Sequence, residues 1–124
     1  MGKMKAVIDS DVLIDFLQGE PRAATEINRY DPLIISVITW IEVMCGAEND
    51  NEKSAAVSLL STMQMVDLSA NIARVAVEAR KKFRLKLPDA VIWATAHQEG
   101  CILVTRNSRD FMTDDPMIRI PYQI

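Results

Sequence analysis

Acidic side chains near the ends of short apolar segments are the residues of this sequence most suited to chemistry. Asp9, Glu42 and Asp89 each lie just after a predicted strand or at the start of a predicted helix. Asn107 and Asp110 follow another apolar run. Carboxylates that converge without matching cations repel one another and are costly to desolvate. A hard divalent cation with oxygen ligands removes that conflict, and Mg²⁺ or Mn²⁺ fits best.

Each of the three acids also has a purely structural interpretation. Thr39 and Glu42 match the spacing of a helix capping box. Asp89 is placed to complement the dipole of a helix that starts near Pro88. Asp9 is placed to start a turn or to cap the following helix. Three separate caps, however, need not lie at equivalent strand ends.

The elements that would position these acids alternate between strand and helix. Strands are predicted for short apolar runs without polar alternation, at 5–8, 33–36, 65–67, 102–104 and 118–120. Helices are predicted at about 12–17, 21–30, 39–47, 51–62, 70–85 and 88–97. This order indicates an α/β protein whose parallel sheet is covered on both faces. In such a sheet the loops after the strands meet at one edge, where the acids would converge.

Composition places the chain among ordinary globular proteins. It has 124 residues, of which 49% are hydrophobic and 25% charged, and we expect one domain over 1–124. No apolar run is long enough to cross a bilayer, and no signal peptide is evident at the start. The two cysteines, Cys45 and Cys101, exclude a disulfide scaffold and suit a reducing compartment. We therefore expect a soluble cytoplasmic domain with no membrane association.

Charge is distributed unevenly along the chain. Residues 1–73 hold 5 Lys or Arg and 11 Asp or Glu, whereas residues 74–124 hold 9 and 6. Most of the basic excess lies in the run Arg80–Lys86. Such a run is either a phosphate-binding surface or a solvated helix end whose cations complement the helix dipole.

Four motifs in order carry a resemblance to a known family. They are Val7–Asp15, Ser36–Val43, Leu87–Ala96 and Leu103–Phe111, and together they extend over most of the chain. With these motifs the sequence resembles the PIN-domain ribonucleases, most closely the VapC-type toxins of toxin–antitoxin pairs. The resemblance implies a three-layer α/β/α sandwich and a Mg²⁺- or Mn²⁺-dependent endoribonuclease. It also implies a homodimer and a small VapB-like antitoxin whose C-terminal segment enters the site.

The resemblance also implies roles for individual residues. Asp9, Glu42 and Asp89 match the catalytic, metal-binding acids, and Ser10 and Thr105 match hydroxyl positions beside the site.

The fourth acidic position of the family is less regular in this chain. The family often has an acid where this sequence has Asn107, so the fourth ligand is either Asn107 or Asp110. Asp11 replaces a frequent asparagine and adds a negative charge near the site.

An acidic site needs nearby cations to attract RNA. The basic residues predicted to supply that attraction flank the third and fourth positions: Lys81, Lys82, Lys86, Arg106 and Arg109.

Two other functions fit parts of the pattern. Asp9 and Asp11 match the D-x-D-x-[TV] motif of haloacid dehalogenase-like phosphatases, in which the first Asp is the nucleophile. That alternative leaves Glu42 and Asp89 without a role. The second is a PIN-like domain that binds RNA or protein without cleavage, which Asn107 leaves open.

Overall fold

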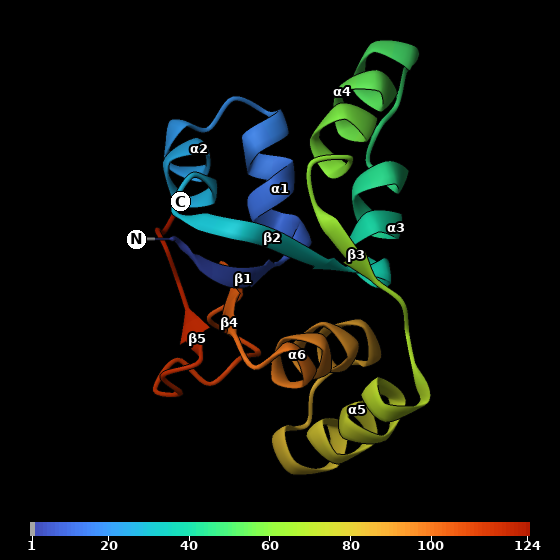
Figure 1. The fold of residues 1–124 in the computed structure, drawn as a ribbon, viewed down its shortest axis with the longest axis vertical. Coiled ribbons are helices and arrows are strands. Elements are labelled where there is room, and N and C mark those ends of the chain that lie inside the picture. Colours follow the sequence, from blue (N-terminus) through green and yellow to red (C-terminus); the bar gives the residue numbers. More distant parts are fainter. Residues whose placement is uncertain (1) are drawn as a thin grey trace.

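The fold is an α/β sandwich around a parallel sheet (Figure 1), seen in a computed structural model that describes residues 2–124. Within these residues the sheet has five strands: β1 (Met4–Ile8), β2 (Tyr30–Ser36), β3 (Gln64–Val66), β4 (Ile102–Val104) and β5 (Ile118–Arg119). Their spatial order is β3-β2-β1-β4-β5, and every neighbouring pair is parallel. The predicted α/β class with a mostly parallel sheet is confirmed.

Helices cover both faces of the sheet, as Figure 1 shows. One face carries α1 (Ser10–Leu17), α2 (Pro21–Ile27), α3 (Val37–Cys45) and α4 (Asp50–Leu60). The other carries α5 (Ala70–Phe83) and α6 (Leu87–Glu99). Because side chains alternate along a strand, Val7 packs with the α5–α6 layer while its neighbours Ala6 and Ile8 pack with the other layer. The two cores make the three-layer arrangement that the resemblance implies.

Short polar side chains begin most of the helices. Asp9 caps α1, Ser36 caps α3, Asn49 caps α4 and Ser69 caps α5, each by accepting a backbone N–H. Helix α6 begins without such a cap and is apolar nearly all round. Its side chains from Ala90 to Ala96 are buried except for the partly exposed Trp93, as its composition predicts.

Most element boundaries differ from the sequence-based prediction by one or two residues, and two of the differences have a clear physical cause. Strand β2 begins at Tyr30, within the predicted second helix, although Pro32 makes this segment look unlike a strand. Pairing of Tyr30 with Met4 of β1 stabilises the strand there. Helix α3 begins at Val37, two residues before Thr39, because the Ser36 hydroxyl accepts the N–H of Ile38 at 3.1 Å.

The described residues contain no helix that is both long enough and apolar enough to span a membrane. Cys45 and Cys101 are both free thiols.

Candidate metal centre

Asp9 lies at the centre of the candidate site, directly after β1. Its side chain is 5% exposed. Oδ1 accepts the N–H of Ser10 at 2.7 Å, and Oδ2 accepts the hydroxyl of Thr105 at 2.7 Å. Burial, and to a smaller extent the charge of Glu42, raises the pKa of Asp9, while the bonds from Thr105 and Ser10 oppose that rise. Asp9 therefore caps α1, as its structural interpretation predicts, and also faces the other acids.

Glu42 reaches this site from α3 through the hydroxyl of Ser10. Ser10 Oγ lies 3.0 Å from Glu42 Oε1 and 3.3 Å from Asp9 Oδ1, so its single proton bridges the two carboxylates. The predicted position of Glu42 in the first helical turn is wrong, because α3 starts at Val37. The capping box with Thr39 is wrong for the same reason, since Thr39 lies inside the helix and is fully buried. Glu42 is exposed and free to face a ligand.

Asp89 lies in the first turn of α6, as predicted, and is half-buried. Burial raises the pKa of its carboxyl first, and the negative charges of Asp9 and Asp110 raise it further. The nearby Lys86 lowers it only partly. Asp9 after β1 and Asp110 in the loop after β4 therefore lie near enough to Asp89 for their charges to act on it. A dipole-complementing role for Asp89 would not explain why two other acids face it.

Asn107 and Asp110 form a reciprocal pair in the loop after β4. The amide Nδ2 of Asn107 donates to Asp110 Oδ2 at 3.1 Å, and the N–H of Asp110 donates to Asn107 Oδ1 at 3.1 Å. This loop forms turns and no helix, so Asp110 does not serve to complement a helix dipole. Asn107 holds the carboxylate of Asp110 in place, and the charge of Asp110 acts on the nearby Asp89.

The donors suit a hard divalent ion held loosely rather than caged. They are all oxygen atoms, and burial first, then neighbouring negative charge, raises the pKa of Asp9 and of Asp89. Among residues 2–124, no three His, Cys, Asp or Glu side chains stand close enough to form a ready-made cage. Mg²⁺ typically keeps several waters and uses one or two protein carboxylates, so an open arrangement fits it.

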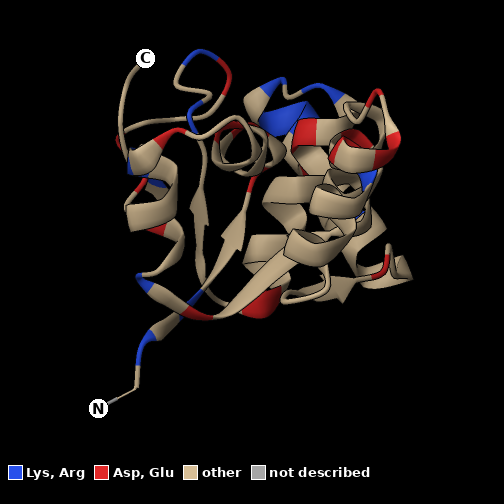
Figure 2. Cartoon of the chain, turned by 90° about the horizontal axis from the view of Figure 1, so that it is seen from above, with Lys and Arg blue, Asp and Glu red and all other residues tan. Residues whose placement is uncertain are grey.

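The candidate RNA-binding cations differ in where their side chains go. Lys81, Lys82, Lys86 and Arg109 are exposed. Figure 2 shows blue segments at the end of α5 and in the loop after β4, at the edge toward which the strands run. Arg106 instead forms an ion pair with Asp15 of α1.

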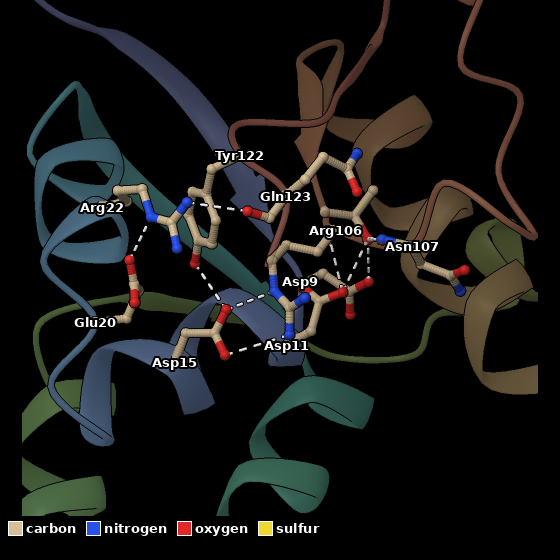
Figure 3. A network of polar contacts seen from close by, with 10 residues as sticks. Asp9, Asp11, Asp15, Glu20, Arg22, Arg106, Asn107, Tyr122 and Gln123 are labelled. Atoms are coloured by element: carbon tan, nitrogen blue, oxygen red, sulfur yellow. Dashed lines mark hydrogen bonds and ion pairs between the residues drawn. The ribbon is translucent and has the colours of Figure 1, made fainter.

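Sequence reasoning missed the part of this network that lies behind the site. Asp15 is buried and pairs with Arg106, which is 91 positions away, and no local pattern signals such a pair. The sequence indicated Asp11 only as an extra charge near the site and as part of the phosphatase motif. Its Oδ2 accepts the N–H of Arg106 at 3.0 Å, and its buried Oδ1 has no hydrogen-bond partner among the described residues (Figure 3). Burial and the charge of Asp9 raise the pKa of Asp11 to about 7.

Comparison with known proteins identifies the family. The family model of the PIN domain matches residues 6–112, so the chain belongs to the PIN-domain family. Among solved structures, it is similar to a chain of a toxin–antitoxin complex from Klebsiella pneumoniae. The two are 38% identical with a TM-score of 0.89, and the match covers 96% of this chain and 99% of that one. The predicted resemblance to PIN-domain proteins of the VapC type is confirmed.

More distant structures share the fold. FitAcB from Neisseria gonorrhoeae is 19% identical with a TM-score of 0.80, over 96% of this chain and 99% of that one. DNA-bound VapBC from Salmonella typhimurium is 23% identical with a TM-score of 0.74, over 94% and 96%. VapC20 of Mycobacterium tuberculosis, a sarcin–ricin loop cleaving toxin, is 16% identical with a TM-score of 0.60, over 88% and 91%. No curated protein sequence matches the chain.

Proposed function

We propose that this protein is a Mg²⁺- or Mn²⁺-dependent endoribonuclease and the toxin of a toxin–antitoxin pair, formed by a single domain over residues 1–124. The observation that carries the proposal is the gathering of acidic side chains at the carboxyl edge of a parallel sheet. Ser10 bridges Asp9 and Glu42, and the charges of Asp9 and Asp110 act on Asp89. Toxin–antitoxin complexes among the solved structures, one of them containing a 38% identical chain, support it. The phosphatase alternative does not account for this convergence.

The chain's own residues have distinct roles in the proposed reaction. Asp9 and Asp89 hold the divalent ion, which when bound supplies Lewis-acid activation of the phosphodiester and of water. Thr105 and Ser10 hold the carboxylate of Asp9 in one orientation, because they donate to opposite oxygens. Glu42, exposed and linked to the site through Ser10, orients the attacking water.

The fourth donor is Asp110, positioned by Asn107. We expect Asp110→Asn to raise the Mn²⁺ concentration at half-maximal cleavage by roughly 3–10-fold, because ligand charge sets affinity for hard cations. The loss should be smaller than for Asp9→Asn. Mn²⁺ titration of the cleavage rate measures it, with the exposed Asp114→Asn as the matched control. If the titration curve of Asp110→Asn is not shifted, Asp110 is not a metal donor and only three acids serve the metal.

The exposed lysines at the end of α5 and before α6 attract the RNA. Neutralising Lys81, Lys82 and Lys86 together should weaken RNA binding and flatten its dependence on salt. The slope of log K against log salt should fall by roughly 2, as expected for about three lost phosphate contacts on single-stranded RNA. The matched control replaces Lys3, Lys5 and Lys53, which are also exposed. Equal effects of the two triple variants would mean that the run Arg80–Lys86 is a solvated helix end and not an RNA-binding surface.

A largely apolar groove beside α3 supports an antitoxin partner. Helices α1, α3 and α4 enclose a groove of about 350 Å³ that is lined by Ile14, Leu17, Val43, Ala55 and Ala56. A small VapB-like antitoxin would seat an apolar segment there and continue to the acids. The product of a neighbouring reading frame should copurify with this chain and suppress cleavage.

We also propose that the protein forms a homodimer in the cytoplasm. Trp40 and Ile41 on α3 are 39% and 47% exposed, large apolar side chains that a second copy would cover. The free Cys45 and Cys101 suit a reducing compartment. Light scattering of the purified protein measures the oligomeric state.

A further inference from the structure

Arg106 binds helix α1 with both its backbone and its side chain (Figure 3). Its N–H donates to Asp11 Oδ2 at 3.0 Å. Its Nη2 donates to Asp15 Oδ1 at 3.3 Å, and its Nε lies 2.5 Å from Asp15 Oδ2 as an ion pair without hydrogen-bond alignment. Asp11 and Asp15 are one helical turn apart, so one face of α1 holds residue 106 at two points.

Asp15 is itself held from a second side. Its side chain is 9% exposed, and its Oδ2 also accepts the hydroxyl of Tyr122 at 2.8 Å. The guanidinium of Arg22 stacks over the Tyr122 ring at 5.2 Å and donates to the carbonyl of Gln123 at 2.9 Å. The carboxylate that receives Arg106 is therefore held in position by contacts independent of Arg106.

The residues on either side of Arg106 belong to the acidic site. Thr105, fully buried, donates its hydroxyl to Asp9 Oδ2 at 2.7 Å. The N–H of Asn107 donates to Thr105 Oγ1 at 3.0 Å, and Asn107 holds Asp110. Movement of residue 106 away from α1 would therefore displace both the hydroxyl that orients Asp9 and the pair that carries the fourth donor.

We propose that the Asp15–Arg106 ion pair is a positioning device for the metal site, and that Arg106 is not an RNA contact. The pair holds residues 105–107 against α1 so that Thr105 and Asn107 keep Asp9 and Asp110 in place. This inference rests on the proposed metal-dependent function and deepens it. It gives Arg106 a positioning role in place of the RNA-binding role predicted from the sequence.

The direction of the change in Mn²⁺ affinity distinguishes a positioning role of Arg106 from a purely electrostatic effect of its charge. Arg106→Gln removes a positive charge near several carboxylates, so Coulomb attraction alone predicts tighter Mn²⁺ binding. Positioning predicts weaker binding, by roughly tenfold, the usual size of effect when a partner that orients a metal ligand is lost. Direct titration of Mn²⁺ by calorimetry, without RNA, gives the dissociation constant independently of cleavage.

Two further variants keep the test sharp. Arg106→Lys retains the charge but not the planar fork of donors, so its Mn²⁺ affinity should fall severalfold while the protein stays folded. Thermal melts of each variant verify folding. Arg109→Gln makes the same charge change on an exposed side chain of the same loop, and its Mn²⁺ affinity should not be weakened.

Each outcome is decisive. Unchanged or tighter Mn²⁺ binding by folded Arg106→Gln and Arg106→Lys, when the wild type binds Mn²⁺, would overturn this inference and leave the proposed function standing. Lower RNA affinity and a smaller salt slope for Arg106→Gln, with Mn²⁺ binding unchanged, would return Arg106 to the RNA contacts. A wild-type protein that binds no Mn²⁺ would overturn the proposed function, and this inference with it.

Discussion

Replacing Asp89 with asparagine is expected to reduce RNA cleavage by roughly a hundredfold or more, because it removes a direct metal donor rather than an outer partner. The fold should be unaffected or slightly more stable. Burial, Asp9 and Asp110 all raise the pKa of this carboxyl, so its charge is unfavourable in the metal-free protein. Cleavage of a labelled RNA at saturating Mn²⁺ measures the first effect, and thermal melting in chelator measures the second.

The exposed Asp114→Asn is the control for Asp89→Asn, since it makes the same chemical change outside the acidic site. Full cleavage by folded Asp89→Asn would remove Asp89 from the metal site. A large loss of thermal stability would instead make Asp89 a structural residue of α6.

Replacing Asp11 with asparagine should stabilise the protein strongly, and only toward neutral and alkaline pH. The pKa of Asp11 rises from 3.8 to about 7 on folding, through burial first and then the charge of Asp9. Between these values the folded protein holds a proton that the unfolded chain releases, so stability falls as pH rises from about 4 to about 7. The Asp11→Asn variant should lack that fall. Because one pKa unit corresponds to about 1.4 kcal/mol, its free energy of unfolding at pH 8 should exceed that of the wild type by at most about 4 kcal/mol.

Denaturant unfolding in chelator at pH 5 and pH 8 measures this difference. The gain from Asp11→Asn should be clearly larger at pH 8, whereas the exposed Asp67→Asn should change little at either pH. Equal gains at both pH values would mean that Asp11 is not destabilised by its charge.

Spacing and element order were enough to place the main acids. Asp9 and Asp89 were predicted at strand and helix ends because each directly follows a clear local pattern, and the structure has them there. Glu42 was assigned to the right helix but the wrong turn. The preference of Ser36 to cap a helix is visible in the sequence, yet Thr39 offers an equally good cap, and only the end of the paired strand decides between them.

The supporting contacts could not be predicted in the same way. The ion pair of Asp15 with Arg106 and the hydroxyl bond from Tyr122 join residues that are 91 and 107 positions apart. Such contacts form only because the loop after β4 and the final residues pack against α1. Composition and periodicity do not predict that packing. The same holds for Ser10, whose bridge to Glu42 requires α1 and α3 to lie side by side.

The central claim is that the acids at the carboxyl edge of the sheet hold a divalent ion with which RNA is cut. The most direct test is the cleavage of labelled total RNA by purified wild-type protein while Mn²⁺ is titrated from chelator to saturation. The account predicts no cleavage in chelator, saturable cleavage with Mn²⁺, and no recovery in Asp9→Asn at the same concentrations. Cleavage that persists in chelator, or RNA that is bound but never cut at saturating Mn²⁺, would contradict it.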